Sequence, residues 1–177
     1  NDTSNNINNT IRTNFTVVDI TNPAVFDVRP VAQTIYNISN VVTISTNVTD
    51  NINVSFVRVN ITFSNSTTQL LTLVRTGTTD KYNNTFTSPN VPGVYNVSFF
   101  ANDTSNNINN TIRTNFTVVD ADNLNITPLA CTPNDANLSQ SIFCNATATD
   151  DVLVDTVIAN VTLPNGATQT YTTLVSA

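Results

Sequence analysis

The sequence contains no histidine, methionine, tryptophan or glutamate, and Lys81 is its only lysine. Every acidic side chain is therefore an aspartate. Histidine, glutamate and lysine supply most of the general acids, general bases and activated nucleophiles that enzymes use in their active sites. Their near-absence predicts a protein that is not an enzyme.

Charge is also scarce. Charged residues make up 10% of the chain, against about 25% in a typical soluble domain. The net charge is −6 and the five arginines are scattered, so no basic patch is available for nucleic acid or for an anionic membrane surface. No apolar run approaches the ~20 residues that span a bilayer, and we expect no membrane insertion in this segment.

What the sequence does contain is a repeat. Residues 1–19 recur letter for letter as residues 102–120, and residues 49–63 align with residues 149–163 at an offset of 100. A period of about 100 residues divides the chain into three parts. Residues 1–19 would be the last strand of a preceding repeat, 20–120 a complete repeat, and 121–177 the first four strands of the next. We therefore expect the chain to be a window on a longer array.

Within residues 20–120 apolar and polar side chains alternate with a period of two, as in half-buried strands. Valine, isoleucine, threonine and aromatic residues dominate, which suits a pleated sheet. Tyr95 follows Pro92-Gly93-Val94 and fits either a tyrosine corner, with its hydroxyl bonded back to the backbone, or a simple core aromatic. The expected fold is an all-β, seven-stranded antiparallel immunoglobulin-like sandwich, with strands near 25–33, 40–49, 54–63, 68–75, 81–87, 94–102 and 110–119.

Several short motifs mark each unit: Thr49-Asp50-Asn51, the segment 95–101, and Phe116-Thr117-Val118-Val119-Asp120. With Tyr82, Phe86 and Pro89, they resemble the immunoglobulin-like and fibronectin-type-III-like repeats of archaeal and bacterial surface glycoproteins. The resemblance implies tandem sandwiches in a fibril, stalk or S-layer-type coat. Because related domains also serve as adhesins, an adhesin or carbohydrate-binding module is the alternative.

Sites of the form N-x-S/T occur 17 times, whereas a random arrangement of the same residues would give about eight. They predict heavy N-glycosylation and an extracellular location. The alternation places Asn47, Asn60, Asn96, Asn115, Asn145 and Asn160 on outward faces. The competing interpretation is a bare surface rich in asparagine and threonine. The complete set is Asn1, Asn8, Asn14, Asn37, Asn47, Asn53, Asn60, Asn65, Asn83, Asn96, Asn102, Asn109, Asn115, Asn125, Asn137, Asn145 and Asn160.

The two cysteines, Cys131 and Cys144, have no histidine or further cysteine with which to form a zinc site. We expect a disulfide between the end of the first strand of the third unit and the inner face of its second strand. Such a bond would contribute about 3 kcal/mol in the chain-entropy model. Two buried free thiols are the alternative.

Four aspartates gather at the predicted junction between units: Asp120, Asp122, Asp150 and Asp151. Aspartates near turns most often serve turn formation. Carboxylate oxygens also suit calcium, and these four are the sequence's candidate calcium ligands.

Near-identical repeats usually continue, and head-to-tail contacts that do not close produce filaments. We expect copies of this unit to be arranged end to end, either in one long chain or in polymerised subunits. In the second case residues 1–19 of one subunit would add a strand to another, but about 25 residues would still be missing from the repeat, which favours the long chain.

Overall fold

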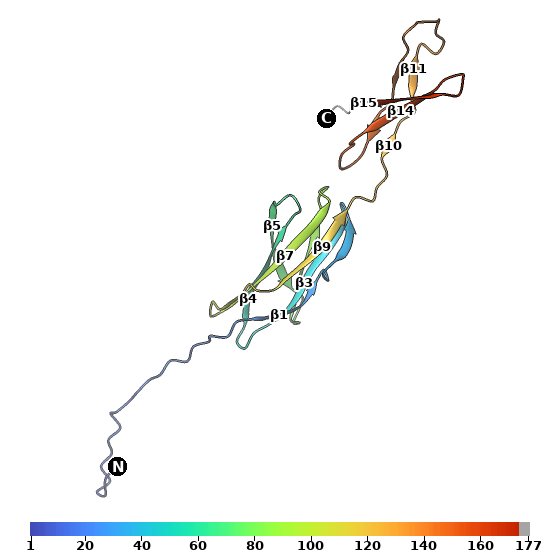
Figure 1. Cartoon of the computed structure of the whole chain (residues 1–177). Helices are drawn as coiled ribbons and strands as arrows, with labels where there is room; N and C mark the ends of the chain where they lie inside the picture. The colour runs from blue at the N-terminus through green and yellow to red at the C-terminus, as the bar shows by residue number, and fades with distance from the viewer. Residues whose placement is uncertain (174–177) are drawn as a thin grey trace.

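The computed structural model describes residues 1–173, which form strands and no helix (Figure 1). The last residues of the predicted third unit, 174–177, lie outside this range. The strands are β1 (Ala24–Arg29), β2 (Thr34–Asn37), β3 (Val41–Thr49), β4 (Val54–Thr62), β5 (Thr68–Arg75), β6 (Lys81–Thr87), β7 (Gly93–Asp103), β8 (Ile108–Asn109), β9 (Arg113–Val119), β10 (Asn125–Ile126), β11 (Ala130–Thr132), β12 (Phe143–Asn145), β13 (Ala148–Thr149), β14 (Val157–Thr162) and β15 (Thr168–Thr173).

Strands β1–β9 form the complete unit, an immunoglobulin-like sandwich. Its hydrogen-bonded order is β1-β3-β6-β5-β4-β7-β9-β2, with β8 beside β7. Most neighbours are antiparallel, but β2 runs parallel to β9. Strand β5 joins the two layers, because residues 68–73 pair with β4 while Val74 and Arg75 pair with β6. The predicted all-β sandwich is confirmed.

The prediction of a single first strand over residues 25–33 was wrong. The segment divides into β1, which pairs with β3, and β2, which pairs with β9. Between them lies the buried Pro30, which has no N–H to donate to a ladder. A turn closed by Thr34 N–H on the Val31 carbonyl carries the chain to the other layer. With the short strand β8, this unit has nine strands rather than seven.

The predicted alternation correctly identified the core. Val57, Val59 and Ile61 of β4 are fully buried, as are Tyr95 and Val97 of β7. Burying each such side chain stabilises the fold by about 1.5–3 kcal/mol. Aromatic rings from three strands meet at the centre, where Tyr95 lies 5.1 Å from Phe116 and 6.1 Å from Phe86, centroid to centroid.

Tyr95 forms the predicted tyrosine corner: its hydroxyl donates to the Val91 carbonyl at 2.7 Å. Burial raises the pKa of this hydroxyl, which keeps it in the donating form. Gly93 makes the corner possible. Its φ is +131°, and a Cβ there would lie 2.4 Å from Ser64 Cβ, so only glycine fits this position.

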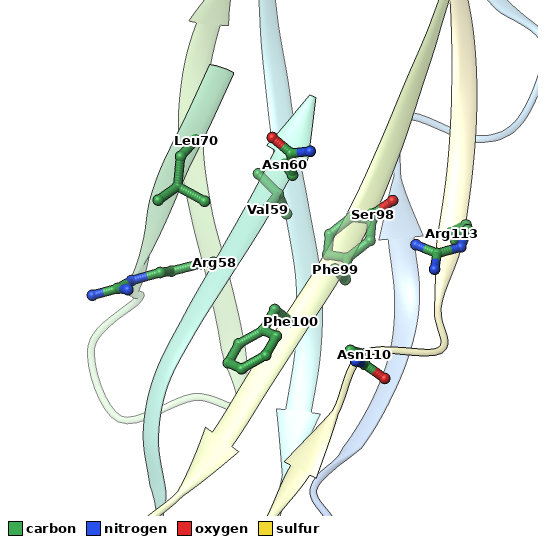
Figure 2. A pocket seen from close by; sticks show the side chains of 9 residues that line it. All are labelled: Arg58, Val59, Asn60, Leu70, Ser98, Phe99, Phe100, Asn110 and Arg113. Carbon is green, nitrogen blue, oxygen red and sulfur yellow. The ribbon is translucent and has the colours of Figure 1, made fainter. Parts of the chain in front are cut away.

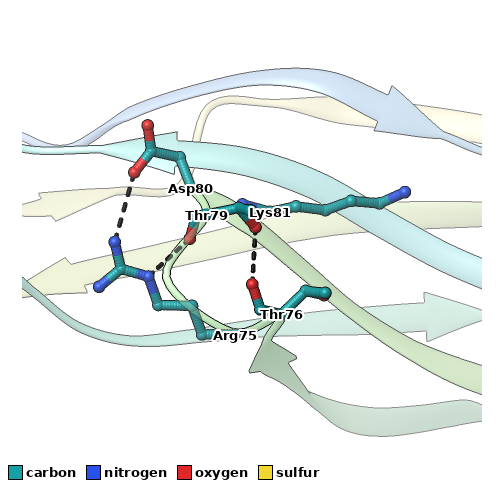
Figure 3. A network of polar contacts seen from close by, with 5 residues as sticks. All are labelled: Arg75, Thr76, Thr79, Asp80 and Lys81. Carbon is teal, nitrogen blue, oxygen red and sulfur yellow. Dashed lines mark hydrogen bonds and ion pairs between the residues drawn. The ribbon is translucent and has the colours of Figure 1, made fainter.

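The β5–β6 turn is organised by Arg75 (Figure 3). Its Nε donates to the Thr79 carbonyl at 2.7 Å, and its guanidinium lies 3.3 Å from an Asp80 oxygen. This is the one ion pair found in residues 1–173. Both side chains are exposed, so the pair contributes only about 0.2–1 kcal/mol and mainly positions the turn.

Residues 1–19 and 102–120 have the same sequence but different structures. Locally they agree, because Asp2 accepts from the N–H groups of Ser4 and Asn6 just as Asp103 accepts from those of Ser105 and Asn107. Residues 1–23 form no strand, however, and Figure 1 shows the segment before Asp19 extending away from the sandwich. Phe15 is 87% exposed, whereas the equivalent Phe116 is fully buried.

Strands β14 and β15 repeat the pairing of β4 with β5 in the complete unit. Val157↔Thr173 through Thr162↔Thr168 reproduces, at an offset of 100, Val57↔Leu73 through Thr62↔Thr68. The turns also match, since Leu163 N–H donates to the Ala167 carbonyl as Phe63 N–H does to that of Thr67.

The predicted disulfide is present between Cys131 and Cys144, which lie opposite each other on β11 and β12. Cys144 is exposed and Cys131 half-buried. Exposure does not identify the inner face in this partial unit, since Val161 is 45% exposed and its repeat equivalent Ile61 is fully buried, so the inner-face position of Cys144 stays a prediction. Strand β12 ends after Asn145 and pairs only with β11, so in residues 121–173 the bond staples a surface hairpin.

The duplicated segment provides a matched stability test. Phe116→Ala should lower the free energy of unfolding by about 3–5 kcal/mol, because it empties the centre of the core. Phe15→Ala, in the same local sequence, should change it by less than about 0.5 kcal/mol. Urea unfolding followed by tyrosine fluorescence measures both. Equal effects of the two substitutions would contradict the assigned core.

Candidate functional site

Most of the predicted glycosylation sites lie where a sugar could extend into solvent. Exposed asparagines are Asn1, Asn8, Asn14, Asn53, Asn65, Asn96, Asn125, Asn137, Asn145 and Asn160. Half-buried asparagines are Asn37, Asn47, Asn60, Asn83, Asn109 and Asn115. All of those assigned to outward strand faces fall in these two groups, so the alternation predicted their positions correctly.

Asn102 is the exception and corrects the sequence-based assignment. Its side chain is only 7% exposed, and its Nδ2 donates to Asn106 Oδ1 at 3.4 Å. The register places it between Phe56 on β4 and Ile108 on β8, and these large apolar side chains cover it. A glycan on Asn102 is incompatible with the folded unit.

Several sites share one face of the sandwich. Asn96 of β7 lies directly opposite Asn115 of β9, and Asn60 of β4 lies opposite Ser98, one pleat repeat along β7 from Asn96. The three asparagines therefore form one patch on the outer face of β4-β7-β9. Opposed side chains in antiparallel strands are about 4.5–5.5 Å apart at Cβ, so Asn96 and Asn115 compete for the same space.

Some sites also adopt a turn that presents the amide nitrogen. Asn65 Oδ1 accepts from both the N–H and the hydroxyl of Thr67, at 3.0 and 2.6 Å. Asn8 and Thr10 form the same pair of bonds. This is an Asx turn, in which the side-chain oxygen is engaged locally. In both exposed turns the Nδ2 group therefore faces solvent.

The predicted aspartate junction is partly assembled. Carboxylate oxygens of Asp120, Asp122 and Asp151 lie within 4.8 Å of one another. Asp150 lies outside this group, and its carboxylate accepts from Val152 N–H at 3.0 Å in a turn. Across the same junction Asn90 Nδ2 donates to the Asp151 carbonyl at 2.9 Å. The sequence thus placed the loop and the linker at the same end, and the structure brings three of the four predicted carboxylates together.

The pKa of Asp151 is raised, first by desolvation and then by the charges of Asp120, Asp122 and Asp150. The like charges make the junction a site of electrostatic repulsion at neutral pH. A cation or a proton would relieve it.

A hollow of about 450 Å³ lies on the outer face of the complete unit. Figure 2 shows Phe100 between Arg58 on one side and Arg113 with Asn110 on the other. The Phe100 ring stacks on Phe56 at 5.8 Å, and the Arg58 guanidinium lies 4.6 Å from the Phe56 ring centroid. The pairings of β4 and β9 with β7, which bring Arg58 and Arg113 beside Phe100, are not visible in the sequence.

No protein-family model and no curated protein matches the chain. The solved structures that resemble it include the following three. CopC from Methylosinus trichosporium OB3b has 17% identity and a TM-score of 0.43 over 57% of this chain and 97% of its own. The tetra-tandem repeat in the extending region of a large adhesion protein has 23% identity and a TM-score of 0.47 over 88% and 38%. Dpr2 Ig1-Ig2 in complex with DIP-Theta Ig1-Ig3 has 11% identity and a TM-score of 0.31 over 86% and 55%.

The chain thus spans well under two thirds of the length of the last two structures. Likenesses this distant carry no argument about function, which depends on the sites described above. Within residues 1–173 there is no helix long and apolar enough to cross a membrane.

The raised pKa of Asp151 gives a prediction. In the presence of a chelator, carbon NMR should find its carboxyl titrating above the ordinary aspartate range. The folded state then binds this proton more tightly than the unfolded state does, so protonation of Asp151 stabilises the fold at low pH. This stabilisation is lost as the pH rises through the folded-state pKa. In the variant carrying Asp120→Asn and Asp122→Asn the pKa should fall but stay raised, because desolvation remains. An unchanged pKa in that variant would contradict the proposed charge repulsion.

Proposed function

We propose that this chain is a structural unit of an extracellular, heavily N-glycosylated fibril, stalk or surface coat, built from immunoglobulin-like repeats placed end to end. The observation that carries the proposal is the recurrence of the β4–β5 ladder as β14–β15, with the same register and the same turn hydrogen bonds. A chain that builds the same ladder twice, about 100 residues apart, supports an organisation as a linear array.

The arrangement of the units supports the same proposal. Figure 1 places the extended residues 1–19 at one end of the sandwich and residues 121–173 at the other. The connection is short, and Ala121 N–H donates to Asn37 Oδ1 at 2.9 Å, which ties the linker to the complete unit. Repeats that contact only their neighbours form elongated molecules.

Glycosylation would explain how a surface with so little charge stays soluble. Polar but uncharged asparagines and threonines occupy the outer faces, and the N-x-S/T sites recur there. Sugars on them would add hydration and would cover sheet edges that can otherwise pair with other chains. The disulfide fits an oxidising, extracellular environment.

Site-by-site glycopeptide mapping of protein purified from its native source tests this. We expect sugars on exposed sites such as Asn65, Asn145 and Asn160, and none on the buried Asn102. Asn96 and Asn115 should seldom be occupied together, because they face each other across one pair of strands. Protein made in a host without N-glycosylation serves as the control for peptide detection. Native protein that carries no sugar would refute the glycan coat.

Electron microscopy of the native material tests the architecture separately. The expected particle is a thin fibre about one domain wide, with sugar density along its length. A compact monomer would contradict the filament, whatever the glycosylation result.

The hollow at Phe100 supports a second candidate function, a carbohydrate-binding module. An aromatic face flanked by arginines is suited to stack on a sugar ring and to bind acidic groups on it. Asn60 lines the same hollow, however, and a glycan attached there would compete for the space. For this reason we rank the structural role first.

A glycan array probed with the unglycosylated chain distinguishes the two functions. If the hollow binds sugars, selective binding should fall at least tenfold in Phe100→Ala and remain unchanged in Phe26→Ala, a half-exposed aromatic on β1. Absence of selective binding by the wild-type chain would rule out the second candidate.

A further inference from the structure

A second group of aspartates lies at the opposite end of the complete unit, where the chain enters it. Asp19 precedes β1, Asp50 follows β3, and Asp103 ends β7. Carboxylate oxygens of these three residues lie within 4.8 Å of one another. They come from positions far apart in the sequence, and the sandwich alone brings them together.

Backbone N–H groups fix the two carboxylates that belong to the sandwich. Asp50 Oδ2 accepts from Ile52 and Asn53 N–H at 2.9 and 3.1 Å. Asp103 Oδ1 accepts from the N–H groups of Ser105 and Asn107 at 2.8 and 2.7 Å. One oxygen of Asp50 and both oxygens of Asp103 are therefore engaged by their own loops, since Asp103 Oδ2 also accepts from Asn107 Nδ2 at 2.7 Å.

Asp19 is held in a similar way, although it lies outside the sandwich strands. Its Oδ1 accepts from Thr21 N–H and from Asn51 Nδ2, both at 3.0 Å, and its carbonyl accepts from Asn107 Nδ2 at 3.2 Å. The Thr21 bond first, and then the Asn51 bond, lowers the pKa of Asp19. The Asp19 carboxylate is therefore ionised at neutral pH.

Two oxygens of the group lack partners, one on Asp19 and one on Asp50, whereas both oxygens of Asp103 accept hydrogen bonds. Asp19 Oδ2 and Asp50 Oδ1 are enclosed by protein and receive no hydrogen bond from the described residues. Asp103 is only 1% exposed. An enclosed carboxylate oxygen without a donor is costly, and neighbouring like charges add to that cost. The one ion pair in residues 1–173, Arg75–Asp80, involves none of these carboxylates.

We propose that Asp19, Asp50 and Asp103 form a Ca²⁺ site that fastens the incoming segment to the sandwich. The ligand atoms are all oxygens, which matches the preference of calcium and not that of zinc. A second, differently composed group of aspartates lies at the next junction: Asp120 is the repeat equivalent of Asp19, and Asp151 lies in the loop equivalent to that of Asp50, although the direct equivalent of Asp50, Asp150, is outside the group. A cation at each junction would fix successive units relative to each other.

Calcium titration of the unglycosylated 177-residue chain, after treatment with a chelator, tests the site. Calorimetry gives the affinity, and amide NMR locates the binding. The amides to watch are those that hold the carboxylates, Ile52, Asn53, Ser105 and Asn107, because they are distant from the Asp120 junction. We expect these signals to shift with a Kd of about 10⁻⁴–10⁻³ M, the range of extracellular modules.

Asp50→Asn is the principal variant. The side-chain oxygen of the new asparagine can still accept from Ile52 and Asn53 N–H. Only the free oxygen of Asp50 is replaced, by an amide group, and no glycosylation site is created. Asp19→Ala is the second variant, and it cannot disturb the sandwich strands. Asp135→Asn removes the same charge from an exposed loop and is the matched control. Amide spectra without calcium establish that each variant is folded.

Calcium should bind at these amides at least tenfold more weakly in both site variants and unchanged in the control. It should also raise the Tm of the wild-type chain by more than that of Asp50→Asn. Unshifted amides in the wild type, equal affinities in Asp50→Asn and Asp135→Asn, or equal responses to MgCl₂ would each overturn the assignment. None of these outcomes depends on whether the native protein is glycosylated or filamentous.

Discussion

The packing of two sheets through alternate apolar side chains is the constraint on which the rest of the structure depends. Tyr95 links the core to the loop before β7. The Tyr95 ring stacks against Phe116 in the core, and the Tyr95 hydroxyl closes the tyrosine corner in that loop. The core fixes the register of β4, β7 and β9, and the register fixes which asparagines face outward. The face that carries Asn60, Asn96 and Asn115, the hollow and the aspartate junctions all follow from this one arrangement.

The two ends of the sandwich carry carboxylates, whereas its faces carry mostly uncharged polar groups, with Arg58 and Arg113 beside the hollow as exceptions. Asp50 and Asp103 gather at one end because β3 and β7 both end there, and Asp120 follows the last strand at the other. Acidic ends and neutral sides suit a unit that meets its neighbours end to end. Cations at the ends and sugars on the sides would therefore perform separate tasks, one joining the units and the other covering them.

Much of the fold could be predicted from residue patterns. The period of two identified the buried positions of β4 and β7, and the Cys131–Cys144 bond followed from the absence of other ligands for these thiols. The division of the first strand was missed, because Pro30 shows where a ladder breaks but not which sheet the chain then joins. Asn102 was misassigned for a similar reason: a site motif carries no information about the Phe56 and Ile108 that cover it.

The sequence by itself determined local turns, and the tertiary structure decided everything that needs a partner. Residues 1–19 and 102–120 separate the two effects. Both form the same aspartate turn, because its donors lie within four residues of Asp2 or Asp103. Only the second copy forms strands, because a strand needs a neighbouring strand with which to form its hydrogen bonds. The group of Asp19, Asp50 and Asp103 was likewise not predicted, since residues more than 30 positions apart meet only when both sheets are packed.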